Sequence, residues 1–305
     1  MTILFTHESG AGHETSPGHP EQAARYGAVI AALEGLALDR REAPLAGDAE
    51  VLRCHPDGYL AGLRAAVPAV GTRQVDADTH LSPGSLEAAL RAVGGACAAV
   101  DAVLAGEAGT AFVAMRPPGH HAETATAMGF CLFGTVAIAA RRALDVHGLA
   151  RVAVLDFDVH HGNGTQDLLW DEARVFFASS HQMPLYPGSG AASETGAHGQ
   201  VMNVPLPPGS DGVLARRGWG DILRRMVAFA PQLVIVSAGF DAHRDDPLAQ
   251  LDWDEDDFAA ISRAICQAAA GCGAPVVSCL EGGYDLAALG RSVRAHVEVL
   301  MEAAE

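Results

Sequence analysis

Short runs of apolar residues recur along this chain, and each run ends in glycine or polar residues. They are rich in Val, Ile, Leu, Ala and Phe and cover residues 3–5, 111–115, 152–157, 175–178, 233–238 and 275–280. Because their apolar residues are continuous rather than alternating, they predict strands buried on both faces, as in a parallel sheet. Longer segments with helical spacing lie between them, at 85–104, 135–147, 254–270 and 286–302. This alternation predicts an α/β fold.

Two of the predicted helices have sequence signals at their starts. Ser82-Pro83 precedes the helix at 85–104, and the acidic run 254–257 opens the helix at 254–270. A side-chain cap accepts hydrogen bonds from the free N–H groups of the first helical turn, and negative charge there interacts favourably with the helix dipole. The sequence has no internal repeat, low-complexity linker or shift in composition, so we expect residues 1–305 to form one domain.

The composition excludes several classes of protein. The 20 Lys and Arg against 37 Asp and Glu give a formal net charge of -17, which disfavours binding to nucleic acid and to acidic membranes. The six cysteines form no CxxC pair, and the sequence shows neither a signal peptide nor a membrane-spanning run, so we expect a cytoplasmic protein. The sequence leaves open whether the chain forms a homo-oligomer.

Four of the predicted strands run directly into polar clusters. The clusters are Arg116-Pro-Pro-Gly-His-His121, Asp156-Phe-Asp-Val-His-His-Gly-Asn-Gly-Thr165, Asp241 and Glu281-Gly-Gly-Tyr284. Ligands of parallel α/β sheets bind at the carboxyl ends of the strands. We therefore expect these four clusters to meet in one site.

The cluster after residue 155 has the side chains of a metal site. If the chain stays extended to residue 160, Asp156, Asp158 and His160 point to one side of the strand. Asp158 and His160, joined by Asp241, give two carboxylates and an imidazole, which suit a divalent transition metal, with zinc favoured. Two alternatives stay open: Asp158 and His160 could form a hydrogen-bonded pair that caps the strand, and a lone Asp241 could cap a turn.

The adjacent histidines His120 and His121 are candidates for proton transfer beside such a metal. In other settings a histidine pair is usually structural or at the surface. Asp156 and Asn163 are free to hold the histidine rings in one orientation. Tyr284, which follows two glycines, could donate its phenolic O–H to a developing oxyanion, although a Gly-Gly-Tyr turn is often only structural.

Together these clusters resemble the zinc-dependent histone deacetylase family, including its bacterial class II-like members and the acetylpolyamine amidohydrolases. The resemblance rests on the clusters at 116–121 and 156–165, on Ser237-Ala-Gly-Phe-Asp-Ala-His-Arg-Asp-Asp-Pro-Leu248 and on Leu280-Glu-Gly-Gly-Tyr284, which occur in the family's order. It extends to Gly18-His-Pro-Glu21, residues 78–85, Gly129-Phe-Cys131 and Tyr186-Pro-Gly-Ser-Gly190.

The resemblance implies the arginase/deacetylase fold, with about eight parallel strands between helices. It also implies one zinc ion held by Asp158, His160 and Asp241, and a potassium ion near Asp156 and Ser179. His121 would act as general base and then acid, with His120, paired to Asp156, as an electrostatic partner, and Tyr284 would stabilise the oxyanion. At position 163 class I members have an aspartate, whereas this chain has the asparagine that is typical of class II. The residues implied for the substrate channel are Phe130, Tyr186, Leu248, Gly129, Gly282 and, at the rim, Asp78.

The substrate class that the resemblance implies is an acyl-lysine peptide or protein, or an acetylated polyamine. Leu248 stands where the polyamine deacetylases have a glutamate, which favours acyl-lysine. A polyamine enzyme could instead supply its acid from Glu194, Asp78 or Asp76.

Two rival interpretations remain. Asp241-Ala-His243 is similar to a motif of the ureohydrolases, which share the fold and bind two manganese ions, but His161 and Asn163 stand where further bridging aspartates are needed. The second rival is an inactive protein that binds acyl-lysine or another small molecule.

His161 is left without a metal role, and we expect it to face away from the site.

Overall fold

The structure, a computed structural model, describes residues 1–304. Its centre is one eight-stranded sheet in which all strand pairs are parallel, in the order β2-β1-β5-β10-β9-β6-β7-β8. The strands are β1 (Thr2–Thr6), β2 (Asp39–Glu42), β5 (Thr110–Ala114), β6 (Val152–Asp156), β7 (Val175–Gln182), β8 (Val201–Leu206), β9 (Leu233–Ala238) and β10 (Val276–Leu280). A separate antiparallel pair joins β3 (Arg73–Gln74) to β4 (His80–Leu81).

All six predicted strands are present, and β7 continues four residues beyond its predicted end. The two strands of the large sheet that the sequence did not predict, β2 and β8, lie at its two edges. β2 has the sequence Asp-Arg-Arg-Glu and no buried residue, and in β8 only Val201, Asn203 and Leu206 are buried. Edge strands need no continuous apolar run, because one side of the ladder and often one face remain accessible to water.

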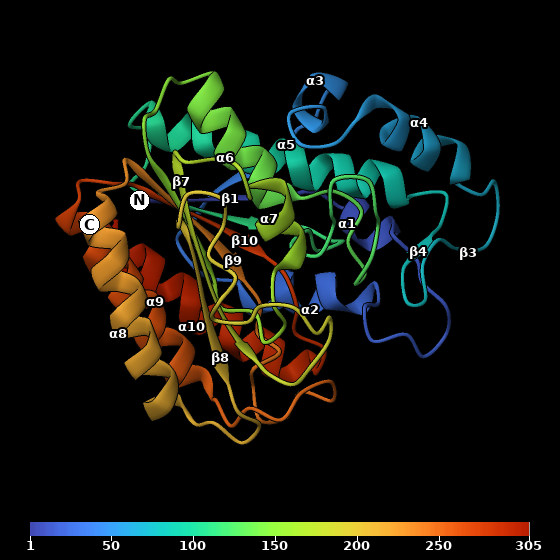
Figure 1. Cartoon of the computed structure of the whole chain (residues 1–305). Coiled ribbons are helices and arrows are strands. Elements are labelled where there is room, and N and C mark those ends of the chain that lie inside the picture. Colours follow the sequence, from blue (N-terminus) through green and yellow to red (C-terminus); the bar gives the residue numbers. More distant parts are fainter. Residues whose placement is uncertain (305) are drawn as a thin grey trace.

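Helices cover both faces of the sheet (Figure 1). One face carries α5 (Ser85–Leu104) and α6 (Thr135–Asp145), and the other carries α2 (Ala24–Ala32), α8 (Gly212–Phe229), α9 (Glu255–Gly271) and α10 (Leu286–Ala303). The other helices of the described residues are α1 (Ser9–Gly12), α3 (Asp48–Val51), α4 (Asp57–Ala66) and α7 (Asn163–Leu168). On β1, Leu4 packs in one core cluster while Ile3 and Phe5 pack in the other, which explains why these three successive residues are all apolar.

The two predicted helix starts have different outcomes. At α9, Asp254 and Asp257 form a capping box, as the acidic run predicted. At α5 the prediction of a side-chain cap was wrong: the N-cap is Gly84, without a side-chain hydrogen bond, and the Ser82 hydroxyl instead accepts the N–H of Glu14 at 2.9 Å. A Cβ at residue 84 would lie 2.3 Å from the Gly12 carbonyl oxygen, so close packing against α1 sets this helix start.

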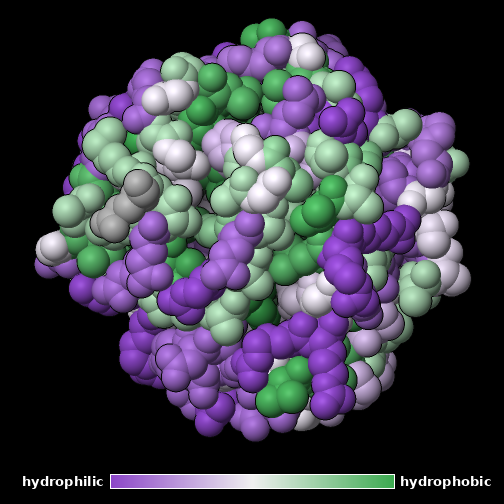
Figure 2. Space-filling model, turned by 90° about the vertical axis from the view of Figure 1, so that its left-hand side faces the viewer, coloured by the Kyte–Doolittle hydropathy of each residue, from purple (hydrophilic) through white to green (hydrophobic). Residues whose placement is uncertain are grey.

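The two ends of the described chain meet at the side where β1 begins (Figure 1). The Met1 amino group donates a hydrogen bond to the Ala304 carbonyl at 3.0 Å. Viewed from this side, hydrophilic and hydrophobic residues are interspersed over the surface (Figure 2). Within residues 1–304, none of the helices combines the length and the apolar character that a membrane span requires.

Candidate metal centre and active site

The four polar clusters follow four neighbouring strands. The order β5-β10-β9-β6 forms the middle of the sheet, and all four strands run in the same direction. Their carboxyl ends therefore deliver His120 and His121 from β5, Tyr284 from β10, Asp241 from β9 and the segment after Asp156 from β6 to one place. The predicted convergence of the four clusters is confirmed.

The side chains of Asp158, His160 and Asp241 form a buried triad whose candidate ligand atoms lie within 4.8 Å of one another. His160 Nδ1 lies 3.2 Å from Asp158 Oδ1 and 3.1 Å from Asp241 Oδ2. The remaining carboxylate oxygens accept backbone N–H groups, Asp158 from Gly282 at 2.9 Å and Asp241 from Val159 at 2.9 Å. The backbone thus fixes both carboxylates with one oxygen directed to the centre of the triad.

The triad fits a cation. Burial lowers the pKa of His160, but hydrogen bonds to Asp158 and Asp241 outweigh it and raise that pKa to about 10, so the site favours positive charge between its carboxylates. Two carboxylates and one imidazole are donors that suit Zn²⁺ and leave a coordination position open. Within residues 1–304 no second cluster of three such side chains occurs, which disfavours the two-metal interpretation.

The two adjacent histidines make different hydrogen bonds. His120 Nδ1 lies 3.0 Å from Asp156 Oδ2, and His121 Nδ1 lies 2.7 Å from Asn163 Oδ1. Their ring centroids are 4.0 Å apart. A loop conformation therefore places both rings on the metal side, as expected, and Asp156 and Asn163 lie behind them.

The histidine pair is electrostatically asymmetric. Burial lowers the pKa of His120, but Asp158 and Asp156 outweigh it and raise that pKa well above its ordinary value. Burial, together with the charge of His120, lowers the pKa of His121 well below its ordinary value. Two neighbouring imidazoles are thus biased to opposite states, one charged and one neutral.

A pocket of about 230 Å³ leads to the triad. It is lined by Asp78, His121, Gly129, Phe130, His160, Leu185, Tyr186, Leu248 and Tyr284. The backbone at Gly129 and Phe130 is left-handed, with φ of 54° and 69°, and a Cβ at residue 129 would lie 2.4 Å from the His121 ring. Glycine is required there, because the chain must pass directly against the imidazole.

One predicted channel residue and two other side chains lie away from this pocket. Gly282 contacts the triad from behind, where a Cβ would lie 2.1 Å from Asp241 Oδ2, so its placement on the channel wall was wrong. Glu194, proposed as an acid for polyamines, is instead tied to the backbone of Gly190 and to Gln166. His161 faces Ser189 and Gln166, as expected of a residue without a metal role.

The pair proposed for potassium is adjacent in the sheet. Asp156 on β6 is the register partner of Ser179 on β7. The Ser179 hydroxyl lies 2.9 Å from His181 Nδ1, and Asp156 Oδ1 accepts the N–H of Asp158 at 3.0 Å. A potassium ion at this position stays a prediction.

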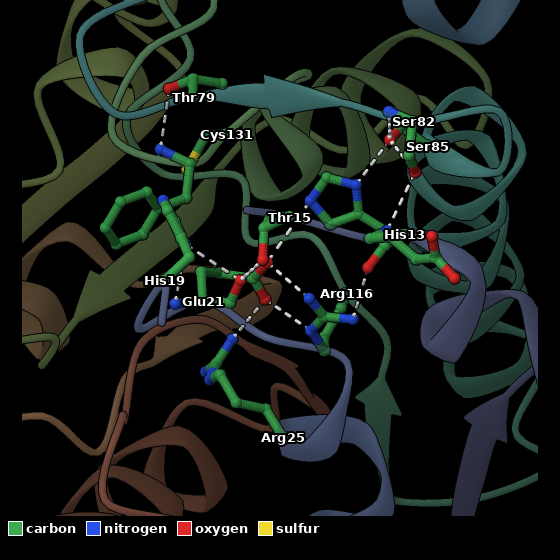
Figure 3. Close-up of polar contacts among 12 residues, drawn as sticks. His13, Thr15, His19, Glu21, Arg25, Thr79, Ser82, Ser85, Arg116 and Cys131 are labelled. Atoms are coloured by element: carbon green, nitrogen blue, oxygen red, sulfur yellow. Dashed lines mark hydrogen bonds and ion pairs between the residues drawn. The ribbon is translucent and has the colours of Figure 1, made fainter. Parts of the chain in front are cut away.

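A buried ionic cluster of Glu21, Arg25 and Arg116 was not predicted from the sequence (Figure 3). Glu21 accepts two hydrogen bonds from Arg116, each 2.5 Å long, and one from Arg25 at 3.0 Å, and all three side chains are fully buried. Arg116 begins the segment that carries His120 and His121, while Arg25 reaches the carbonyl of Gly283 at 2.6 Å. The cluster thus joins two of the strand ends that build the site.

Two buried carboxylates hold the loops of the site. Glu281 Oε2 accepts the N–H groups of Gly119 at 2.6 Å and His120 at 3.1 Å. Asp246 accepts the N–H of Tyr284 at 2.7 Å. Both lie in segments that were singled out in the sequence, but only the packing shows which backbone groups they bind.

Comparisons with known proteins agree with this geometry. The histone deacetylase domain matches residues 19–300. A histone deacetylase-like amidohydrolase of Pseudomonas aeruginosa is 40% identical over 288 residues, covering 90% of this chain and 73% of the relative. A probable deacetylase of Archaeoglobus fulgidus is 37% identical over 297 residues, covering 94% and 82%.

A crystal structure of the HDA15 HD domain has the same fold. It superposes with a TM-score of 0.93 at 30% sequence identity and covers 99% of this chain and 89% of that one. The parallel sheet, the strand-end site and these matches all agree. The chain belongs to the histone deacetylase family.

Proposed function

We propose that this protein is a zinc-dependent amidohydrolase that removes acetyl or other acyl groups from the ε-amine of lysine in peptides or proteins. The observation that carries the proposal is that the triad residue His160, the neutral histidine His121 and the phenol of Tyr284 all line one narrow pocket. The family and the relatives named as deacetylases support amide hydrolysis.

Asp158, His160 and Asp241 would hold the zinc ion. When bound, zinc supplies Lewis acidity toward the amide carbonyl and toward a water molecule. His160 of the triad and His121 of the histidine pair both line the pocket, so an acyl group bound in it would lie beside both.

The two histidines and Tyr284 have separate roles. His121, kept neutral by burial and by its charged neighbour, takes a proton from the attacking water and passes it to the leaving amine. His120 stays protonated and stabilises negative charge. Burial raises the pKa of Tyr284 well above its ordinary value, so its O–H stays protonated and donates to the carbonyl oxygen as charge develops there.

The pocket walls favour an acylated lysine side chain. Phe130 and Tyr186 provide aromatic walls for an aliphatic stem, and Asp78 lies at the pocket where it can accept a substrate N–H. Leu248 offers no charge to a second amine. We therefore place acyl-lysine ahead of acetylated polyamines as the substrate class. For a polyamine, Asp78 would be the acid in the pocket lining that pairs with the second amine.

The test is a comparison of kcat/KM on acetyl-, trifluoroacetyl- and longer acyl-lysine peptides and on acetylputrescine and acetylspermidine, with zinc-loaded protein. We expect peptide hydrolysis, and loss of about a thousandfold in kcat for His121→Ala with zinc content unchanged. Full activity in that variant would refute its role. Binding of acyl-lysine peptides without hydrolysis would favour the inactive-binder interpretation.

A further inference from the structure

The amide of Asn163 lies between His121 and a carboxylate that has no role in the mechanism above. Asn163 Oδ1 lies 2.7 Å from His121 Nδ1, and its Nδ2 donates to Glu123 Oε1 at 2.8 Å and to Met128 Sδ at 3.4 Å. His121 and Asn163 are buried, whereas Glu123 is partly exposed. Within residues 1–304 no ion pair to Lys, Arg or His occupies the Glu123 carboxylate.

The chemistry of these partners fixes the direction of the amide. A carboxylate and a thioether can only accept hydrogen bonds, so the side of Asn163 that faces Glu123 and Met128 must carry the NH₂ group. If the amide were flipped, its carbonyl oxygen would face a carboxylate. Glu123 thus holds the oxygen of the amide toward His121.

The direction of the amide in turn fixes the tautomer of His121. An amide oxygen accepts a hydrogen bond, so His121 must carry its proton on Nδ1, and the lone pair is left on Nε2. A flipped amide would present a donor to Nδ1 and would move the proton to Nε2, where a proton acceptor is needed.

We propose that Glu123 is a positioning residue for His121: through the Asn163 amide, it keeps the His121 proton on Nδ1 and leaves Nε2 free to accept a proton. The inference rests on the proposed function, because only a hydrolase needs Nε2 as a base. His120 has its carboxylate, Asp156, in direct contact at 3.0 Å. For His121 the carboxylate is that of Glu123, and the Asn163 amide lies between the two. This arrangement orients the His121 ring without placing a full negative charge against it.

The loop that carries Glu123 is docked on the helix that carries Asn163. Asp167, on α7 like Asn163, accepts hydrogen bonds from the Thr124 N–H at 2.8 Å and the Thr124 hydroxyl at 2.6 Å. The Glu123 N–H donates to the Thr126 carbonyl at 3.0 Å, which closes the turn. These contacts hold Glu123 and Asn163 in register with each other.

The experiment compares Glu123→Gln with Glu123→Met in the full chain. Glutamine can still accept from the Asn163 NH₂ group, whereas methionine of similar length offers only a weak acceptor. We expect Glu123→Met to lower kcat on an acetyl-lysine peptide by about ten- to a hundredfold with KM changed by less than about twofold. Glu123→Gln should restore kcat to near the wild-type value. Glu34→Met, an exposed carboxylate elsewhere, is the matched control and should behave as wild type.

A second measurement does not depend on activity. Nitrogen-15 NMR of the His121 ring in metal-free protein, assigned with His121→Ala, should show the proton on Nδ1 in the wild type and in Glu123→Gln, and a shift toward Nε2 in Glu123→Met. A wild-type ring protonated on Nε2, or equal losses of kcat in the Gln and Met variants, would overturn the inference. A wild-type protein with the expected tautomer but no hydrolysis of any acyl-lysine substrate would instead refute the proposed function.

Discussion

The carboxylate of Asp246 accepts a hydrogen bond from the backbone N–H of Tyr284 at 2.7 Å. Its second oxygen accepts the N–H of Leu248 at 3.0 Å. One buried side chain therefore fixes the backbone that carries the phenol and the backbone of a pocket wall residue, although the two segments follow different strands. The position of the Tyr284 hydroxyl depends on this contact.

Asp246→Ala should lower kcat by about ten- to a hundredfold, because a small displacement of Tyr284 misplaces its O–H. Zinc content should stay at the wild-type level, since no triad residue is changed. Asp246→Asn should not restore kcat, because its NH₂ group would face one of the two backbone N–H groups. Steady-state kinetics with metal analysis checks this, and wild-type kcat in the alanine variant would contradict it.

We expect one zinc ion per chain, measured by inductively coupled plasma mass spectrometry. Asp241→Ala should abolish zinc retention, because it removes one of three ligands and leaves His160 with one carboxylate. His161→Gln is the matched comparison, since its ring faces Ser189 and Gln166. That variant should retain one zinc ion per chain. Two metal ions per wild-type chain would favour the ureohydrolase interpretation.

The centre of the sheet and the position of the site could be predicted because they need no knowledge of strand order. Strands β5, β6, β9 and β10 are buried on both faces, so their sequences are mostly apolar without alternation, and each strand leads into a polar cluster. In a parallel sheet all such ends lie at one edge, whatever the order of the strands. The prediction that Asp158, His160 and Asp241 lie together followed from this shared edge.

The supporting contacts could not be predicted, because they join residues far apart in the sequence. Arg25 and Gly283 are 258 positions apart, and the sequence of α2 contains no sign that an arginine on it is fully buried. Gly282 was assigned to the channel from the family resemblance, but the sequence cannot tell which side of the backbone faces the triad. The edge strands β2 and β8 lack the apolar pattern of the central strands.

Loss of the Glu21 carboxylate should destabilise the protein strongly. Burial alone would raise the pKa of Glu21, but Arg116 and other neighbours lower it well below its ordinary value, so it is charged. Glu21→Ala leaves two buried guanidinium groups without their carboxylate, which should cost about 3–5 kcal/mol of unfolding free energy. Urea denaturation measures this cost. Asp48→Ala, which breaks the exposed pair with Arg64, should change stability little, and equal effects of the two variants would contradict the prediction.

Substrate preference should depend on the charge at position 248. Leu248 lines the pocket together with Asp78, so Leu248→Glu would add a second carboxylate to its wall. We expect the ratio of kcat/KM for acetylspermidine to that for an acetyl-lysine peptide to rise by about tenfold. Leu248→Gln, of the same size but uncharged, should leave the ratio near its wild-type value. An unchanged ratio in the glutamate variant would show that the wall at this position does not select the substrate.

Acid should destabilise the protein through His296, which is buried in the core. Its ring lies between the hydroxyls of Ser262 at 2.6 Å and Ser278 at 2.8 Å, and burial lowers its pKa to about 3. The unfolded chain has the ordinary pKa of about 6.5, so between pH 6.5 and 3 it binds a proton that the folded protein excludes. Stability from this group is present above pH 6.5 and is lost as the pH falls.

Between pH 7.5 and pH 5.5 this difference should remove about 1.4 kcal/mol of unfolding free energy. His296→Gln does not titrate and can still donate to one serine and accept from the other. Urea denaturation of both metal-free proteins at the two pH values isolates the effect, because the other histidines are common to both. The wild type should lose about 1.4 kcal/mol more than the variant. Identical pH dependence in the two proteins would mean that His296 also takes up a proton in the folded state.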